Sequence, residues 1–219
     1  MWRVELETVT DDLAGLLCAE ERARAERFLS DRDRRRWTRS RGVLRALLGR
    51  YLHEDPRTLR FATGAHGKPE LRDDAIGSIS ASRRNPSRPW RLSFNLSHSG
   101  GLALFAFTRT DAVGVDVEVA RRPIEEISLA ARVLGPAEAR RLEGLDPAMR
   151  GHEFLRAWTR HEAELKCRGR GIGAGSASAG ELWIAELDVG SRAAAAVALE
   201  RAPRELRCWH WPATGASSG

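Results

Sequence analysis

Apolar positions follow a helical pattern in the N-terminal part of this 219-residue chain. Over residues 19–52 they recur at steps of three and four among many arginines, which is typical of a helix with one buried face. Asp55-Pro56 ends this region, because proline disfavours a helical conformation of the residue before it. A short strand is predicted over residues 58–63.

The rest of the chain mixes strand-like and helix-like patterns. Residues 91–96 alternate between apolar and polar, and residues 102–107 are continuously apolar, as in a strand buried on both faces. Segments rich in Gly, Ser, Asn or Pro at 73–89 and 169–180 are predicted to be loops. The other expected elements are a strand at 113–119, helices at 123–133, 136–145 and 151–168, and strands at 182–187, 195–199 and 206–211.

The order helix, strands, helices, strands predicts an α+β fold. We expect two similar α+β halves, residues 1–111 and 112–219. The composition, with 42% apolar and 30% charged residues, is that of an ordinary globular protein. No apolar run approaches the ~18 residues of a membrane span, and the N-terminus lacks a signal-peptide pattern. Three cysteines without paired spacing are typical of a reducing compartment, so we expect a cytoplasmic protein without membrane contact.

A net charge of +6 and a pI near 10.1 favour anionic partners. Nucleic acid, an acidic protein and a polyphosphate small molecule all meet this criterion. The densest basic stretch is Arg32–Arg41, but a charge run of this kind is usually a solvated helix face. Charge alone therefore does not select the partner.

Lysine occurs only at Lys68 and Lys166, among 36 basic residues. In a chain that otherwise uses arginine, a retained lysine suggests that a compact ammonium is needed, as in contacts with phosphate. The alternative is that both lysines escaped a compositional drift toward arginine. The residues around each lysine have to decide between the two interpretations.

The stretch 113–119, Val-Gly-Val-Asp-Val-Glu-Val, is the most informative motif. As a strand it places four valines on one face and Gly114, Asp116 and Glu118 on the other. Carboxylate oxygens in such a pair suit Mg²⁺, and the glycine favours a close approach to the backbone. The alternative is an ordinary strand with a solvated acidic face.

A second carboxylate source lies in the expected helix 151–168. Trp158, Glu162 and Lys166 are four residues apart, so they form one stripe that Trp158 can anchor by packing. Glu162 could join the two carboxylates of the strand at a hard-metal site, with Lys166 touching a phosphate. The alternative is an exposed Glu-to-Lys pair worth a few tenths of a kcal/mol.

Two further stretches carry candidate phosphate ligands. Phe94–Gly101 runs from a strand into a glycine turn, where the Ser97 hydroxyl, the His98 imidazole and backbone amides could cradle a phosphate. A structural histidine is the alternative, and neither an acidic partner for a Ser-His-Asp triad nor a G-x-S-x-G elbow is evident. Gly67-Lys68-Pro69 is a turn by composition.

Together these motifs, in this order, resemble those of 4′-phosphopantetheinyl transferases, over roughly residues 20–172. The similarity is greatest to the larger, pseudo-dimeric type that activates polyketide and nonribosomal peptide synthetases. The resemblance implies transfer of the phosphopantetheine arm of coenzyme A to a serine of an acyl or peptidyl carrier protein, with release of 3′,5′-ADP. It also implies a cofactor site between two α+β halves and a monomeric enzyme. The basic chain would suit an acidic carrier.

The resemblance also implies roles for individual residues. Asp116, Glu118 and Glu162 would hold Mg²⁺, with Mn²⁺ as an alternative, and Glu162 would accept the serine proton directly or through a water. The implied contacts to coenzyme A fall into two groups. Those near the pyrophosphate are Lys166, His98 and Ser97, and those near the ribose 3′-phosphate are Lys68, Pro69 and Arg45.

The sequence departs from the family pattern at two places. His161 stands where family members usually carry lysine, which makes the charge there dependent on pH, and the loop 73–89 is longer than typical. Two other functions stay open, the first because of the net charge and the stretch Arg32–Arg41, and the second because of His161. One is a nucleic-acid-binding basic protein, and the other is a catalytically weakened relative that only binds carriers.

Overall fold

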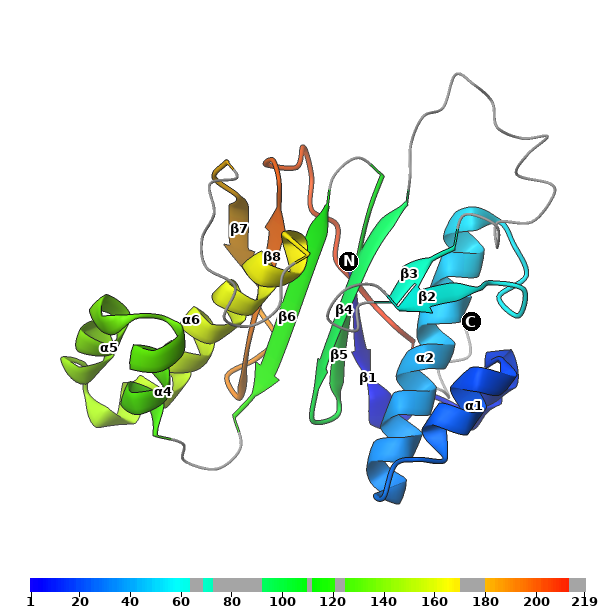
Figure 1. The fold of residues 1–219 in the computed structure, drawn as a ribbon, viewed down its shortest axis with the longest axis horizontal. Coiled ribbons are helices and arrows are strands. Elements are labelled where there is room, and N and C mark those ends of the chain that lie inside the picture. Colours follow the sequence, from blue (N-terminus) through cyan, green and yellow to red (C-terminus); the bar gives the residue numbers. More distant parts are fainter. Residues whose placement is uncertain (64–68, 73–91, 110–111, 121–124, 170–179, 213–219) are drawn as a thin grey trace. The chain divides into compact units, whose positions relative to one another are not determined.

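Helices and strands are interspersed in the computed structural model, which describes residues 1–63, 69–72, 92–109, 112–120, 125–169 and 180–212 (Figure 1). The strands are β1 (Trp2–Glu5), β2 (Phe61–Thr63), β3 (Pro69–Leu71), β4 (Ser93–Ser99), β5 (Leu102–Thr108), β6 (Val113–Val119), β7 (Trp183–Glu186), β8 (Ala193–Leu199) and β9 (Trp209–His210). The α-helices are α1 (Ala19–Ala25), α2 (Asp31–Leu52), α4 (Glu126–Val133), α5 (Pro136–Glu143) and α6 (Pro147–Cys167). Short 3₁₀ helices lie at Leu6–Thr8 and Asp11–Leu16. The α+β class is confirmed.

The chain divides into two compact units. One comprises residues 1–2 and 91–209, and the other comprises residues 3–90 and 210–219. The expected halves, 1–111 and 112–219, stay a prediction.

In the first unit, β4 and β5 form an antiparallel hairpin and β6, β8 and β7 form an antiparallel sheet in that order. The hairpin is tight, because Ser99 pairs with Leu102 and only two glycines lie between them. Gly100 has φ +60°, the sign that the first central residue of a type II′ turn requires. Strand β4 therefore continues through Ser99, beyond the predicted end at residue 96.

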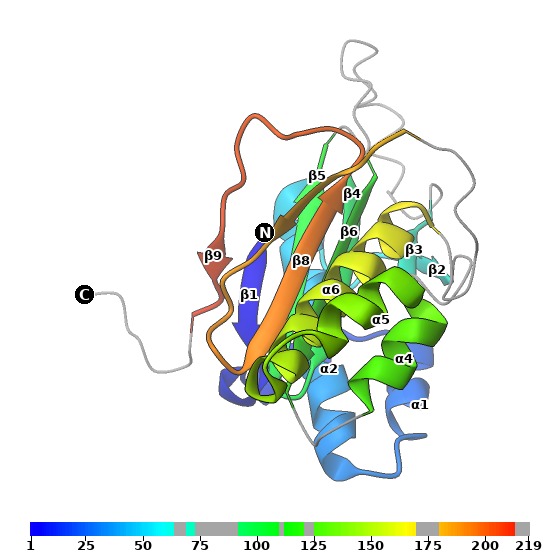
Figure 2. The same cartoon turned by 90° about the vertical axis from the view of Figure 1, so that its left-hand side faces the viewer.

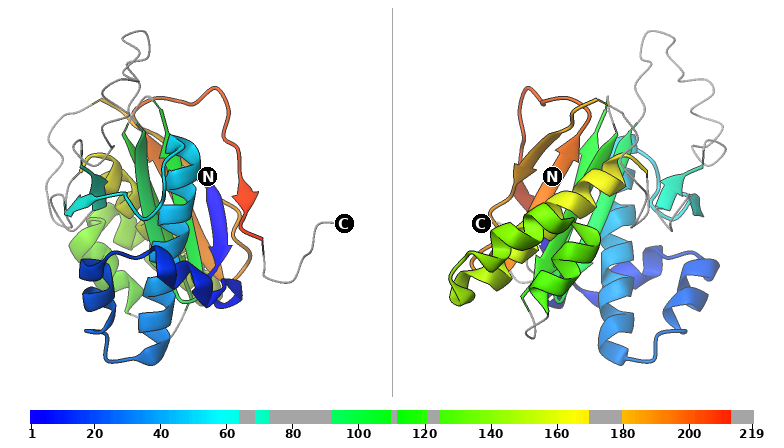
Figure 3. Two further views of the ribbon diagram at one scale, coloured as in Figure 1. Left: turned by 90° about the vertical axis from the view of Figure 1, so that its right-hand side faces the viewer. Right: turned by 60° about the vertical axis from the view of Figure 1, so that its left-hand side comes forward.

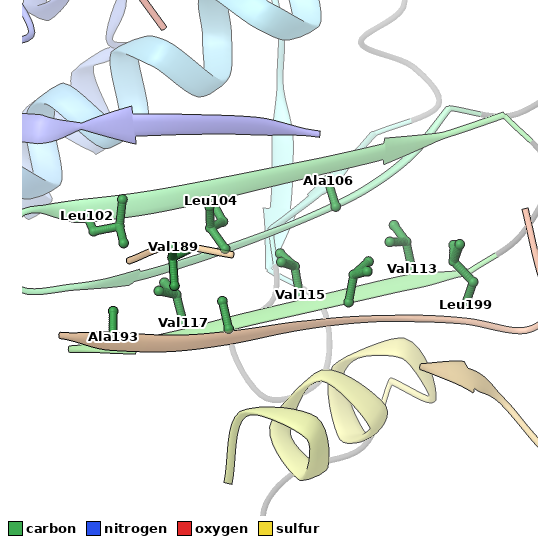
Figure 4. Close-up of a cluster of buried hydrophobic side chains, with 11 residues drawn as sticks. Leu102, Leu104, Ala106, Val113, Val115, Val117, Val189, Ala193 and Leu199 are labelled. Atoms are coloured by element: carbon green, nitrogen blue, oxygen red, sulfur yellow. The ribbon is translucent and has the colours of Figure 1, made fainter. Parts of the chain in front are cut away.

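The two faces of β6 have different partners, as the alternation predicts. Its valines pack with apolar side chains of β5 and β8 in a buried cluster (Figure 4). Val115 and Val117 are fully buried there, and Leu104 of β5 lies in the same cluster. This burial fixes the register of β6, because a shift by one residue would exchange the valines with Asp116 and Glu118.

Helix α6 runs along the other face of β6 and β8 (Figures 1 and 2). Its approach is close because small residues line the interface, among them Ala163 of the helix and Ala196 and Ala198 of β8. A Cβ atom added at Gly114 would lie 2.0 Å from the carbonyl oxygen of Ala163. The close approach expected at Gly114 is therefore made by the backbone of α6.

The N-terminal part of α6 packs with α4 and α5 around Phe154, which is buried (Figure 2). Trp158 lies against this cluster, with its ring centroid 5.8 Å from that of Phe154. Asp146 begins the helix by accepting a hydrogen bond from the backbone N–H of Ala148, and Pro147 occupies the first turn, where proline is tolerated. Trp158 thus anchors the helix as the stripe predicts.

In the second unit, the region expected to be one helix over 19–52 is two helices, α1 and the longer α2 (Figure 3). The break is capped by Ser30, whose hydroxyl accepts a hydrogen bond from the backbone N–H of Asp33. Helix α2 buries the apolar side chains of its C-terminal half, among them Leu44 and Leu47, and ends at His53 in a left-handed conformation. The apolar period continues across the break, so periodicity alone did not reveal it.

The basic stretch Arg32–Arg41 lies on α2, and four of its arginines pair with acidic residues. Arg34 pairs with Asp31 and Glu26, Arg36 with Glu7, Arg39 with Asp11 and Glu7, and Arg41 with Glu21. Much of the positive charge is thus neutralised locally. This supports the interpretation as an ordinary helix face.

Candidate active site

Asp116 occupies the centre of the face of β6 that α6 covers. Only 3% of the residue is exposed. Its Oδ1 accepts a hydrogen bond of 2.7 Å from the Ser97 hydroxyl on β4 and an ion-pair contact of 2.6 Å from Lys166 Nζ on α6. Two other elements, β4 and α6, therefore hold this buried carboxylate of β6, which excludes a solvated acidic face at this position.

Several acceptors among the described residues surround the Lys166 ammonium. They include Asp116 Oδ1, the Ser97 Oγ at 3.2 Å and the Val115 carbonyl oxygen at 3.4 Å. An ammonium carries three protons and no acceptor, so these contacts suit lysine and not the planar fork of arginine. The side chain remains 28% exposed, so it lies at the edge of the buried carboxylate. The ion pair is with Asp116 on the strand, and an exposed Glu162–Lys166 pair does not describe this site.

Glu162 lies one turn before Lys166 and is half-buried. Burial raises the pKa of its carboxyl, the negative charges of Asp116 and Glu118 raise it further, and Lys166 opposes them. The three carboxylates predicted to act together thus share one electrostatic environment. That environment contains more negative charge than Lys166 alone offsets.

Two buried carboxylate oxygens at this site have the chemistry of ligands for a hard cation. Among the buried side-chain atoms of the described residues, Asp116 Oδ2 and Glu162 Oε1 lack a hydrogen-bond partner. A buried carboxylate oxygen without a partner carries a desolvation cost that a hard cation offsets. In the described ranges, however, no three His, Cys, Asp or Glu side chains stand close enough to hold a metal ion. Asp116 and Glu162 fit such a cation, whereas their joint ligation with Glu118 stays a prediction.

Ser97 and His98, expected to contact a phosphate at a strand end, lie near the end of β4, and that contact stays a prediction. Because β4 continues through Ser99, the side chains of Ser97 and His98 lie on opposite faces of the strand, one buried and the other exposed. The Ser97 hydroxyl is engaged with Asp116 and Lys166. The backbone at this position is paired with β5. The Ser97 hydroxyl thus has protein partners, while the His98 side chain is exposed.

Arg45 is buried in a network of hydrogen bonds, and its role as a phosphate ligand stays a prediction. Its side chain is 1% exposed, and its Nε donates to Glu21 Oε2 at 2.6 Å. Its Nη1 donates to the carbonyl oxygens of Pro56 and Leu59. Through these hydrogen bonds, the guanidinium connects α2 with α1 and with the segment that follows α2. Its burial leaves little of it accessible to solvent.

Glu21 completes this buried cluster and gives a testable pH dependence. Burial acts to raise the pKa of its carboxyl, but hydrogen bonding and charge from Arg45 and Arg41 outweigh it, so the pKa is lowered. The stabilisation is fully present above its ordinary value of 4.5 and is lost as the pH falls through the lower folded value. We expect Glu21→Gln to reduce the free energy of unfolding near neutral pH by about 3–5 kcal/mol, because Arg45 loses its counter-charge.

Urea unfolding of wild type and Glu21→Gln across the acid range measures this effect. The difference between the two proteins should shrink on acidification. An exposed control is Glu26→Gln, which also removes a carboxylate paired with an arginine and should change stability by less than about 1 kcal/mol. A wild-type to Glu21→Gln difference that is constant with pH contradicts the prediction.

The remaining predicted contacts to coenzyme A lie at the edge of, or beyond, the described residues. Pro69 begins β3, a position that proline tolerates, in a two-stranded ribbon with β2. Lys68 and the loop 73–89 lie outside the described residues. His161 is half-buried on α6, and burial lowers the pKa of its imidazole, while Glu164 opposes this.

The sequence analysis did not assign a role to two residues of the site, Asn95 and Ser99. The Asn95 carboxamide oxygen accepts a hydrogen bond of 2.8 Å from the backbone N–H of Val115. The Ser99 hydroxyl donates to Glu118 Oε2 at 2.7 Å. Their signal was present, because Asn95, Ser97 and Ser99 place polar side chains at every second position of a strand, on a face that is buried.

Two protein-family models match this chain, one in its C-terminal half and one in its N-terminal half. Residues 112–215 match the family model described as the 4′-phosphopantetheinyl transferase superfamily, and residues 2–110 match that of the N-terminal region of 4′-phosphopantetheinyl transferase. These two regions are consistent with two similar halves. No helix in the described part of the chain is long and apolar enough to cross a membrane.

Individual relatives show the same family. The chain is 39% identical over 175 residues to the 4′-phosphopantetheinyl transferase HetI of Nostoc sp., covering 78% of this chain and 69% of the relative. It is 27% identical over 155 residues to the transferase Sfp of Bacillus subtilis, covering 70% and 60%. It is 32% identical over 120 residues to the transferase AcpT of Escherichia coli, covering 53% and 60%. The chain belongs to the 4′-phosphopantetheinyl transferase family.

Proposed function

We propose that this chain transfers the 4′-phosphopantetheine group of coenzyme A to a serine hydroxyl of an acyl or peptidyl carrier protein. The observation that carries the proposal is the buried Asp116, held by Lys166 and Ser97, beside a second carboxylate with an unpartnered oxygen. Such a site combines an ammonium that can contact a pyrophosphate with carboxylates that suit a divalent cation. The names of the relatives support the same activity.

The chain's own residues have distinct tasks in this reaction. The carrier's serine oxygen forms a bond to the phosphorus next to the pantetheine, and the bond from that phosphorus to the oxygen of the leaving 3′,5′-ADP breaks. Glu162 accepts the serine proton, because its half-buried carboxylate has an unpartnered oxygen. Lys166 stabilises the charge of the pyrophosphate from its position at the edge of the site.

Asp116, Glu118 and Glu162 are the residues that would hold Mg²⁺, with Mn²⁺ as an alternative. When bound, the metal ion would offset negative charge on the pyrophosphate. Support for this assignment comes from the unpartnered oxygens of Asp116 and Glu162 and from the electrostatic effect of Glu118 on Glu162.

The expected partner is an acidic carrier protein. The net charge of +6 would accelerate encounter with such a partner, although steering does not by itself select one carrier. A monomeric, cytoplasmic enzyme fits this proposal. Nucleic-acid binding is less favoured, since several arginines of the basic stretch are paired with carboxylates.

Mass spectrometry of apo carrier proteins after incubation with coenzyme A and Mg²⁺ tests the function. A carrier that gains one phosphopantetheine identifies both reaction and partner. Fatty-acid, polyketide and peptide carriers should be compared side by side. Carrier binding without any mass gain would instead establish the catalytically weakened relative. Salt-sensitive binding of nucleic acid without carrier modification would establish the other alternative.

The two lysines should differ in their kinetic effects. Lys166→Ala is expected to reduce kcat by about 10²–10³-fold, because an ammonium that stabilises the transferring group is lost. Lys68→Ala should mainly raise the KM for coenzyme A, by about tenfold, if it binds the ribose 3′-phosphate. Steady-state kinetics with varied coenzyme A measures both effects.

The control for this comparison is Arg160→Ala, which removes an exposed cation from the same helix as Lys166. Its kcat and KM should stay close to wild type. Unchanged kinetics in both lysine variants would mean that the two lysines are chance survivors of the arginine-rich composition.

A further inference from the structure

Strands β4 and β6 belong to different sheets, yet they lie against each other in the first unit. Side chains of β4 form hydrogen bonds to β6. Asn95 accepts from the backbone N–H of Val115, Ser97 donates to Asp116, and Ser99 accepts from the backbone N–H of Val119 at 3.1 Å. Three successive inward positions of β4 thus take the place of a backbone ladder.

The two serines repeat the same contact two residues apart. Ser97 donates to Asp116 Oδ1 and Ser99 donates to Glu118 Oε2, each at 2.7 Å. Each carboxylate lies 19 residues after its serine. Each carboxylate of β6 is therefore matched by one hydroxyl of β4.

The hydrogen bonds of Ser99 determine the direction of its proton. A hydroxyl has one proton and two acceptor sites. Because the backbone N–H of Val119 occupies an acceptor site, the Ser99 proton is directed to Glu118. Ser99 is 4% exposed, so water competes poorly for these contacts. A bond from a hydroxyl to an ionised carboxylate is among the stronger hydrogen bonds in proteins.

A held Glu118 matters because neighbouring carboxylates repel each other. Asp116 and Glu118 share one face of β6, and a glutamate has enough rotatable bonds to turn away from a like charge. The Ser99 hydroxyl opposes that motion by fixing one oxygen of Glu118. Outer groups that orient a ligating carboxylate affect metal affinity by about 10–100-fold when removed.

We propose that Ser99 is a positioning residue that orients Glu118 for binding of a divalent cation. This inference rests on the proposed function, in which Glu118 is a metal ligand. Ser99 itself touches neither substrate nor cation in this role. It acts through the carboxylate of Glu118.

The test compares Ser99→Ala with wild type by titrating Mn²⁺ alone and following free Mn²⁺ by electron paramagnetic resonance. We expect the Kd for Mn²⁺ to rise by about tenfold in Ser99→Ala. In carrier loading, the KM for the metal should rise by a similar factor, while kcat at saturating metal stays near wild type. A merely structural role would lower the Tm without separating the metal KM from kcat.

Thr159→Val is the matched control. Thr159 is fully buried on α6 and its hydroxyl donates to the carbonyl oxygen of Arg156 at 3.1 Å, so its removal also deletes a part-buried hydrogen bond, like that of Ser99. This variant should keep the wild-type Kd for Mn²⁺. An unchanged Kd in Ser99→Ala, an equal rise in Thr159→Val, or a wild type that binds no Mn²⁺ overturns the inference. Failure of wild type to load any carrier overturns the proposed function instead, and the comparison of Mn²⁺ affinities remains decisive for Ser99.

Discussion

Replacing Asp116 with asparagine is expected to reduce carrier loading by about a thousandfold or more, which corresponds to several kcal/mol of lost transition-state stabilisation. The substitution keeps the size of the side chain but removes its negative charge. That charge pairs with Lys166 through Oδ1 and is available to a metal ion through the unpartnered Oδ2. Glu162→Ala should have a comparable effect, because it removes both the proton acceptor and a proposed metal ligand. The measurement is the rate of holo-carrier formation by mass spectrometry with coenzyme A and Mg²⁺.

Stability has to be separated from catalysis in this experiment. Asp116→Asn leaves the Lys166 ammonium without its ion-pair partner, although at 28% exposure that ammonium retains some contact with water. Thermal unfolding should therefore accompany the assay. Asp188→Asn is the matched control, since Asp188 is an exposed carboxylate that accepts a backbone hydrogen bond from Gly190 in the same unit. Full activity of a folded Asp116→Asn protein would exclude the proposed mechanism.

Replacing Gly114 with alanine is expected to destabilise the protein by about 3 kcal/mol or more, at or above the upper end of ordinary overpacking. The added Cβ would lie 2.0 Å from the Ala163 carbonyl oxygen and 2.4 Å from the Cys167 backbone nitrogen. Both are backbone atoms of α6 and cannot move aside by a change of rotamer. The helix has to shift, which would also displace Glu162 and Lys166 from β6, so carrier loading should fall together with the Tm.

The control is Gly144→Ala at the end of α5. There an added Cβ would meet nothing closer than 3.7 Å, and φ is −74°, so alanine fits without strain. Urea unfolding of the two variants measures the contrast. An unfolding free energy of Gly114→Ala within about 0.5 kcal/mol of wild type would contradict the packing seen between β6 and α6.

Local patterns in the sequence predicted the elements around the site well. Strand β6 begins and ends where the alternation of 113–119 places it, and its valines and carboxylates lie on separate faces. The spacing of Trp158 and Lys166 placed both on one helix, with Trp158 packed and Lys166 near Asp116. These predictions succeeded because period two and period 3.6 are properties of a single element and need no knowledge of its neighbours.

The partners of individual side chains could not be predicted from local patterns. Arg45 is next to a run of buried leucines, but only its pairing with Glu21, 24 residues earlier, shows that it is a buried structural cation. His98 and Ser97 are adjacent in sequence, and only the extent of β4 shows that they lie on opposite faces. Strand β1 was also missed, because four residues carry too little periodicity to recognise. The break between α1 and α2 is similarly short and was missed for the same reason.

Local sequence patterns and motifs were sufficient to predict the α+β class, the two faces of β6, the stripe on α6 and the family to which the chain belongs. The tertiary structure decided which groups meet: Lys166 with Asp116, Ser99 with Glu118, and Gly114 with the backbone of α6. The physical reason is that periodicity specifies which side chains a strand or helix presents together. The partner of each side chain depends on how separate elements pack, and that is settled by burial over the whole unit.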